Sequence, residues 1–217
     1  MNTKRTKAAL AGLAAAALGA VILTAVAAAP GWSKIPAITV VSPDSDPRIP
    51  AGQEAVAFWN RTFAELGTPF RLGAVTLVTG TVPERDLKDA SDQMLHHGWA
   101  STLPASLTRF PGDIIIVLSD ASFVSFTARS GARVVIGIKN GNSWPLALPN
   151  VVRNVIAHEL GHAIGLGHDA DPTLLMCGRP APCRPDAFES QTARFFPLSA
   201  AERARLLYLY PREWAAR

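Results

Sequence analysis

The sequence predicts a single domain of mixed α/β or α+β class, with helices packed on a β-sheet. After residue 30, runs of β-branched and apolar residues bounded by turn residues alternate with stretches whose apolar residues recur at helical spacing. No internal repeat or long linker divides the rest of the chain. A chain of 217 residues has room for one ordinary globular domain with a solid core. We therefore expect one domain over residues 31–217.

Four stretches have the composition of strands bounded by turns: residues 35–42, 70–80, 112–120 and 132–142. The third stretch is continuously apolar, which is typical of a buried central strand. The first helix is predicted over residues 51–66, because its large apolar residues recur at three- and four-residue steps and line one face. These residues are Val56, Trp59, Phe63 and Leu66.

Residues 82–99 are polar and are expected to form a loop with a helical turn. They contain His96 and His97. Adjacent histidines bind one ion only with an unusual backbone, so we expect both side chains to face solvent, with a second ion site as the alternative.

Two more helices are predicted in the C-terminal half. The first opens at Asn150, a suitable N-cap residue, and ends at Gly165. Its buried face is expected to contain Val152, Val155, Ile156, Leu160 and Ile164. The last helix begins at Ser199, which has Glu202 at capping-box spacing, and stops at Pro211.

The first 29 residues predict export. Lys4, Arg5 and Lys7 precede an uncharged run of small and apolar residues over 8–29. Small residues near its end suit cleavage of a signal peptide, but the run is also long enough to remain as a membrane anchor. Secretion after cleavage and anchoring in the cell envelope therefore both remain as alternatives.

Export also bears on the charge and on the cysteines. Loss of residues 1–29 removes three positive charges and no negative ones, lowering the net charge from +4 to +1. The basic pI therefore gives no argument for a nucleic-acid partner. Cys177 and Cys183 are the only cysteines, and in an oxidising compartment we expect them to form a disulfide. Free thiols and a zinc-ligand role for Cys177 are the alternatives.

The segment "HELGHAIGLGH", residues 158–168, has the residue types and spacing of a metal site. On a helix, His158 and His162 lie one turn apart on the same face, with Glu159 beside them. Gly165 can adopt positive φ and turn the chain, which lets His168 fold back as a third ligand. Three neutral nitrogen ligands leave a fourth position open, as in catalytic zinc sites.

This segment matches the HExxHxxGxxH signature of the metzincin zinc peptidases at every position, and "HDADPTLLMCG" after it resembles the matrixin branch. The resemblance extends loosely over residues 35–210. It implies a metzincin-like zincin fold: a twisted, mostly parallel sheet with an antiparallel edge strand, two long helices and a C-terminal helix. It also implies that Met176 is the turn methionine, an apolar floor beneath the zinc.

The function implied is that of an exported zinc-dependent endopeptidase with one catalytic zinc ion. Zinc-bound water would attack the peptide carbonyl while Glu159 acts as general base and then general acid. The substrate would be an extended peptide paired with the sheet edge, which we expect at Arg133–Lys139. We expect a monomer, no nucleic-acid partner, and membrane contact only through an N-terminal anchor. A zinc hydrolase of a non-protein amide such as cell-wall material, and an inactive envelope metal-binding module, are the alternatives.

Several features depart from the matrixin pattern. We find no pro-segment with an inhibitory cysteine before residue 35, residues 120–132 look too short for a structural zinc loop, and no calcium site is evident. Asp169 stands where many matrixins have serine and is the runner-up to His168 as third ligand. Cys177 and Gly178 replace the residues usual after the methionine, so the wall of the specificity pocket is undefined.

Overall fold

The computed structural model describes residues 31–98, 100, 102–142, 147–178, 183 and 192–217. The predicted signal or anchor over residues 1–29 lies outside these residues. Among the helices of the described part, none combines the length and the apolar character needed to cross a membrane.

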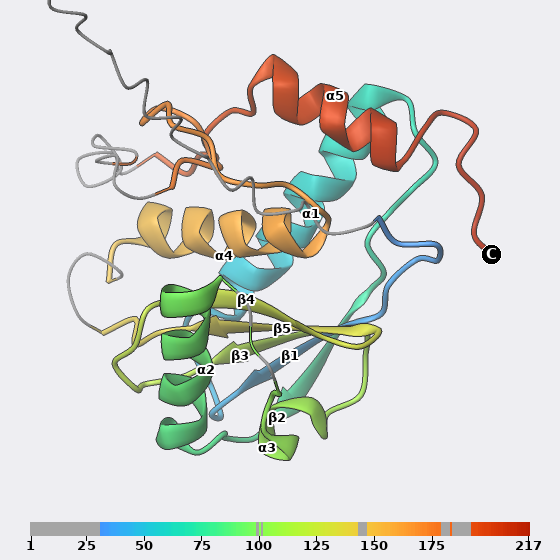
Figure 1. Ribbon diagram of the computed structural model, residues 1–217. Coiled ribbons are helices and arrows are strands. Elements are labelled where there is room, and N and C mark those ends of the chain that lie inside the picture. The colour runs from blue at the N-terminus through green and yellow to red at the C-terminus, as the bar shows by residue number, and fades with distance from the viewer. Residues whose placement is uncertain (1–30, 99, 101, 143–146, 179–182, 184–191) are drawn as a thin grey trace, which may run out of the picture.

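Five strands form one sheet in the order β2-β1-β3-β5-β4 (Figure 1). All neighbouring pairs are parallel except β4 and β5, which are antiparallel. The predicted mixed α/β class, with a mostly parallel sheet and one antiparallel edge, is confirmed. The strands are β1 (Ile38–Ser42), β2 (Val75–Thr79), β3 (Ile114–Leu118), β4 (Phe126–Ser130) and β5 (Arg133–Ile138).

The prediction that residues Arg133–Lys139 form the sheet edge is wrong, because β5 lies between β3 and β4. The edge on this side of the sheet is β4, a strand that was not predicted from the sequence. A two-residue turn containing Gly131, at φ +58°, joins β4 to β5 as a hairpin. Because β4 is covered differently on its two faces, it alternates apolar and polar residues and lacks the continuous apolar run of β3 and β5.

Helices cover both faces of the sheet (Figure 1). One face carries α2 (Glu84–His97) and α3 (Ala105–Thr108), and the other carries α1 (Ile49–Leu66) and α4 (Pro149–Ala163). Beyond them lies α5 (Ala200–Leu209), which begins with the predicted capping box between Ser199 and Glu202.

The polar stretch predicted as a loop with a helical turn is instead the 14-residue helix α2. It buries only Leu87, Ala90 and Ser91, so its apolar stripe is too narrow to be recognised from the sequence. The Ser91 hydroxyl holds it to the loop before β4 by donating to the Val124 carbonyl at 2.8 Å. His96 and His97 are exposed at its last turn, as predicted.

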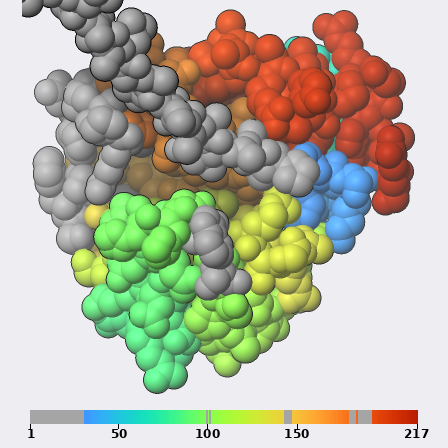
Figure 2. Space-filling view, in the orientation of Figure 1, coloured from blue at the N-terminus to red at the C-terminus, as the bar shows by residue number. Residues whose placement is uncertain are grey.

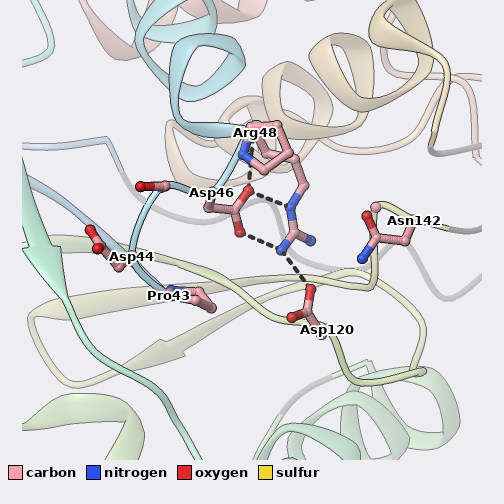
Figure 3. Close-up of a pocket in the computed structure, with 9 residues that line it drawn as sticks. Pro43, Asp44, Asp46, Arg48, Asp120 and Asn142 are labelled. Atoms are coloured by element: carbon pink, nitrogen blue, oxygen red, sulfur yellow. Dashed lines mark hydrogen bonds and ion pairs between the residues drawn. The ribbon is translucent and has the colours of Figure 1, made fainter.

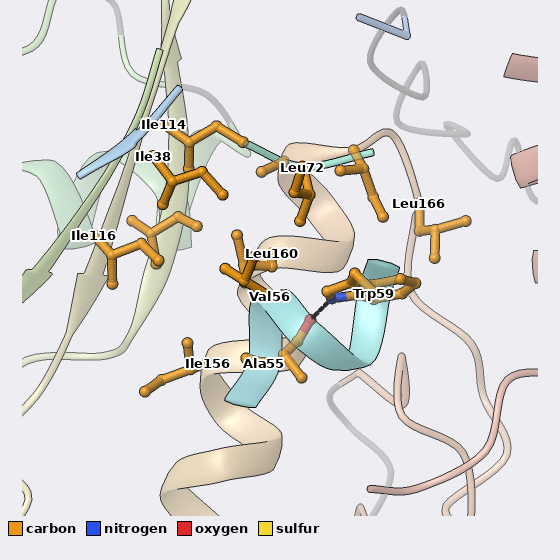
Figure 4. Packing of buried hydrophobic residues seen from close by; sticks show 14 of the residues in the cluster. Ile38, Ala55, Val56, Trp59, Leu72, Ile114, Ile116, Ile156, Leu160 and Leu166 are labelled. Carbon is orange, nitrogen blue, oxygen red and sulfur yellow. Dashed lines mark hydrogen bonds between the residues drawn. The ribbon is translucent and has the colours of Figure 1, made fainter. Parts of the chain in front are cut away.

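The larger core lies between the sheet, α1 and α4 (Figure 4). The four residues predicted to line one face of α1 are all buried, and the Trp59 side chain is completely enclosed. The Trp59 indole N–H donates to the Ala157 carbonyl at 2.9 Å, which satisfies the polar end of a buried aromatic residue. This contact fixes α1 against α4 one residue before His158.

Candidate metal centre

Helix α4 places His158 and His162 one turn apart on the same side. The helix begins with Pro149, whose missing N–H costs nothing at that position, and its N-cap is Leu148. The predicted N-cap at Asn150 is therefore wrong. Asn150 is buried, and its side chain donates to the Thr192 carbonyl at 2.6 Å and accepts from the Arg194 N–H at 3.1 Å.

Asn154, one turn further along α4, holds the same segment. Its side-chain amide donates to the Arg194 carbonyl at 3.0 Å, and its side-chain oxygen accepts from the Phe196 N–H at 2.9 Å. The two asparagines thus attach residues 192–196, which precede α5, to α4.

Three histidines converge where α4 ends. Gly165 has φ +102° and turns the chain, as predicted, so that His168 returns towards the helix. The His162 Nε2 lies 3.0 Å from the His158 Nε2 and 3.1 Å from the His168 Nε2. A tetrahedral zinc ion with Zn–N bonds of about 2.0–2.1 Å separates its nitrogen ligands by about 3.3 Å. The three rings are therefore arranged as one ligand set.

The other ring nitrogens determine the tautomers. The Nδ1 of His158 lies 2.9 Å from the Leu175 carbonyl, and the Nδ1 of His162 lies 2.9 Å from the Leu166 carbonyl. A carbonyl oxygen only accepts hydrogen bonds, so each Nδ1 carries a proton, and in the neutral form of the ring Nε2 presents its lone pair to the cluster. Lone pairs this close repel one another, and a divalent cation between them removes the repulsion. The donor set therefore fits zinc.

Burial varies across the cluster. His158 is buried, His162 is intermediate and His168 is exposed, so the site opens to solvent on the His168 side. Burial lowers the pKa of His162, although its hydrogen bond to the Leu166 carbonyl acts in the opposite direction. The ring is consequently held neutral at neutral pH, the form in which imidazole binds a metal.

Met176 is completely buried against α4. A Cβ atom on Gly161 would collide with the Met176 sulfur, so only glycine allows this approach beside His162. Gly178 plays the same part for the third ligand, since a Cβ there would collide with the His168 ring. The sequence analysis missed both glycine roles, because they depend on contacts between distant residues.

The loop from His168 to Gly178 is closed by its own backbone. The Asp169 N–H donates to the Met176 carbonyl at 2.7 Å, and the Gly178 N–H donates to the Asp169 carbonyl at 3.0 Å. The Asp169 carboxylate accepts from the Asp171 N–H at 2.9 Å, and the ligand cluster consists of the three histidines without it. Cys177 forms the expected disulfide with Cys183, which excludes free thiols and a zinc-ligand role for Cys177.

Glu159 is buried beside the cluster, at 7% exposure. Its carboxylate Oε2 accepts a hydrogen bond from the Thr127 hydroxyl at 2.7 Å. Thr127 lies on the edge strand β4, which the sequence analysis did not recognise as a strand. The alternation of apolar and polar residues in "FTARS", residues 126–130, was the available signal.

The end of α4 is held from outside the motif. The Trp32 indole N–H donates to the Ala163 carbonyl at 2.9 Å, and the Tyr210 hydroxyl donates to the Ile164 carbonyl at 3.0 Å. Two terminal carbonyls of the helix are thereby satisfied just before the turn that carries His168. Figure 2 shows the N-terminal part of the described chain, in blue, beside the C-terminal residues, in red.

A second polar cluster lines a pocket where β1, β3 and β5 end (Figure 3). Arg48 and Asp46 form a buried ion pair at 2.6 Å, and the Arg48 guanidinium also donates to the carbonyls of Ser119 and Lys139. We call this arrangement the Arg48 clamp. Because its donors meet acceptors within the chain, it serves to hold the strand ends together.

The fold is similar to that of solved metallopeptidases. Metalloproteinase-II from Bacteroides fragilis superimposes with a TM-score of 0.51 at 13% identity, over 84% of this chain and 55% of that one. Archaemetzincin from Methanopyrus kandleri gives a TM-score of 0.45 at 22% identity, over 82% of this chain and 96% of that one. A zinc-dependent peptidase from Methanocorpusculum labreanum gives 0.40 at 15% identity, over 78% and 99%.

At these identities the first likeness concerns the fold, and the two lower scores add nothing to it. It is consistent with the predicted zincin-like architecture and does not distinguish the matrixins from other branches. No protein-family model matches the sequence, and no curated protein matches it.

Proposed function

We propose that this protein is an exported, zinc-dependent endopeptidase. The observation that carries the proposal is the convergence of three histidine Nε2 atoms, at 3.0 and 3.1 Å, with the buried Glu159 next to His158 on the same helix. Three nitrogen donors next to one acid are typical of a catalytic zinc site that keeps a position open for water.

His158, His162 and His168 would hold the ion. When bound, zinc lowers the pKa of a coordinated water to about 7 and polarises the carbonyl that is attacked. The hydrogen bonds from Nδ1 of His158 and His162 to backbone carbonyls orient these rings and make Nε2 more basic. The ring of His168 is positioned through the glycine turn and through its close contact with Gly178.

Glu159 would move the proton. Its carboxylate accepts a proton from the attacking water as the new C–O bond forms, and then gives that proton to the leaving nitrogen as the C–N bond breaks. Atoms and charge balance without a covalent intermediate on the protein. The low exposure of Glu159 supports this role, because exclusion of bulk water strengthens interactions at the reacting centre.

The substrate in this proposal is an extended peptide that pairs with β4. This strand has β5 on one side only and is the sheet edge that contacts Glu159 through Thr127. An edge strand presents unpaired N–H and C=O groups, to which a peptide can add as a further strand. A monomer offers such an edge without a partner subunit.

Three further observations support export and a matrixin-like centre. The Cys177–Cys183 disulfide is the kind of bond that persists in oxidising compartments, and Lys4, Arg5 and Lys7 precede an uncharged run. The buried Met176 against α4 is in keeping with a turn methionine.

The test uses the full-length chain expressed with export and purified from the medium or from membranes. We expect one zinc per chain, cleavage of internal bonds in a peptide library, loss of cleavage with a chelator, and only a small residual rate in Glu159→Gln at unchanged zinc content. Mass spectrometry of the same sample shows whether the N-terminal segment has been removed. Cleavage of cell-wall amides alone, or zinc binding without hydrolysis of any amide, would overturn the proposal.

A further inference from the structure

We infer that Thr127 is a positioning residue that sets the orientation of the Glu159 carboxylate relative to the edge strand. The inference rests on the proposed peptidase function for its kinetic consequences and on the geometry alone for the contact itself. Nothing in the zinc-ligand motif contains this residue, which lies 32 positions from Glu159 in sequence.

The side chain of Thr127 points to the face of the sheet that α4 covers, because successive side chains of a strand alternate between the two faces. Its neighbours Phe126 and Ala128 belong to the smaller core on the α2 side. Successive side chains of a strand point to opposite faces, so Thr127 faces α4. Its pairing with Ile136 of β5 fixes the register, and a slip of one residue would place an apolar side chain opposite Glu159.

The hydroxyl of Thr127 contacts Glu159 at two places. It lies 2.7 Å from the carboxylate Oε2 and 2.8 Å from the main-chain carbonyl oxygen of the same residue. The hydroxyl has one proton for these two acceptors, and a hydrogen bond to a charged acceptor is the stronger one. With Glu159 ionised, the proton is therefore donated to Oε2, and the carboxylate cannot rotate freely about its last bond.

This bond fixes the rotation of the Glu159 carboxylate through Oε2. The direction in which the carboxylate can exchange a proton with the attacking water and the leaving nitrogen is then fixed as well. A base must lie within about 2.6–3.2 Å of the proton it takes, so a carboxylate of fixed rotation has an advantage in rate.

The same contact couples the base to the substrate-binding edge. A peptide paired with β4 takes its position from the backbone of that strand, and Thr127 joins the strand to both the main chain and the side chain of Glu159. The distance between the scissile bond and the base is then set by one residue. A local shift of β4 therefore moves the substrate and the carboxylate together.

The main variant is Thr127→Val, which keeps the shape and β-branching of the side chain and removes the hydroxyl. We expect kcat to fall at least about tenfold, with KM within about twofold and zinc content unchanged. Thr127→Ser restores the hydroxyl and is expected to recover kcat to within about threefold. The matched control is Thr76→Val on β2, the opposite edge strand, which should leave kcat as it is.

Two further readouts separate positioning from a general structural role. In a Glu159→Gln background, Thr127→Val should change the residual rate by less than about twofold, because no carboxylate is left to orient. In the zinc-free protein, the carboxyl ¹³C signal of Glu159 should shift in Thr127→Val and stay in place in Thr76→Val.

The outcomes distinguish the two proposals. A wild-type protein that binds zinc and cleaves no peptide defeats the proposed function, while the ¹³C comparison still decides whether Thr127 holds the carboxylate. An active wild type with an equally active Thr127→Val defeats the positioning role. Equal rate losses for Thr127→Val with and without Glu159 would also defeat it.

Discussion

The histidine cluster and the Arg48 clamp are both polar assemblies next to the main sheet, and they satisfy their polar groups in opposite ways. In the clamp, a guanidinium meets a carboxylate and two carbonyls, so donors face acceptors. In the histidine cluster, backbone carbonyls hold the Nδ1 atoms of His158 and His162, and the two Nε2 atoms consequently face each other at 3.0 Å. The comparison shows how a structural ion pair, in which donors meet acceptors, differs from a set of ring nitrogens whose arrangement fits a divalent cation.

The largest expected effect is on the histidine cluster. His162→Ala removes the ligand that lies nearest to both other rings, so zinc affinity should fall by several orders of magnitude, since three-ligand sites depend on every ligand. The zinc-free variant should be at least as stable as the zinc-free wild type, because one repelling lone pair is removed. Zinc titration by calorimetry, with thermal unfolding of both zinc-free proteins, checks the two statements. A zinc-free variant that is clearly less stable would contradict the comparison.

Substitution in the Arg48 clamp should change the stability of the protein and leave metal binding unchanged. Arg48→Met leaves the Asp46 carboxylate buried without its cation and should lower the free energy of unfolding by about 3–5 kcal/mol. The folded fraction should bind zinc as the wild type does. Urea unfolding measures the loss, with the exposed Arg61→Met as control, for which a change within about 0.5 kcal/mol is expected. A zinc affinity that falls with Arg48→Met would show that the two assemblies are coupled.

The disulfide beside the cluster should have an intermediate effect. It closes a short loop directly after Met176, so the Cys177→Ser/Cys183→Ser double variant should lose about 2 kcal/mol of stability. Zinc should bind more weakly as well, because Cys177 lies in the loop that holds His168 and Gly178. Unfolding and zinc titration with and without a reductant measure both effects. Unchanged zinc affinity would show that the hydrogen bonds of the loop hold His168 by themselves.

The smallest effect concerns Asp113 at the start of β3, outside both assemblies. Burial by itself raises the pKa of Asp113, but the hydrogen bonds from Lys34 and the Ala37 N–H and the charges of Lys34 and Arg133 outweigh it, so the pKa lies below 3.8. A lowered pKa means stability that is present above the unfolded value and lost as the pH falls through the folded value. Because Lys34 is half exposed, Asp113→Asn should cost below about 1 kcal/mol at pH 7. Acid unfolding of both proteins checks this, and parallel curves below pH 4 would contradict it.

The histidine cluster, whose residues are close together in the sequence, was predicted correctly. Contacts between residues that are distant in the sequence were not predicted. Helix periodicity and a single glycine turn were enough to bring His158, His162 and His168 together, because all three lie within 11 residues. Thr127, Gly178 and the Arg48 clamp depend on strand order and on contacts between distant segments, for which periodicity has no signal.

Two errors, one in the sheet and one in the helices, have related causes. Strand β4 is short and amphipathic and was not recognised, so the edge that the family resemblance implies was assigned to β5. Helix α2 buries few residues and reads as a polar loop. Both elements lie at the periphery, where burial imposes only a weak pattern on the sequence.

Zinc titration of the purified protein, followed by ¹⁵N NMR of the histidine rings, tests the central claim most directly. Before zinc is added, Nδ1 of His158 and His162 should carry the proton, and one equivalent of zinc should then shift the Nε2 signals of His158, His162 and His168 together. Protonated Nε2 atoms in the zinc-free protein at neutral pH, or a chain that takes up no zinc, would contradict the account.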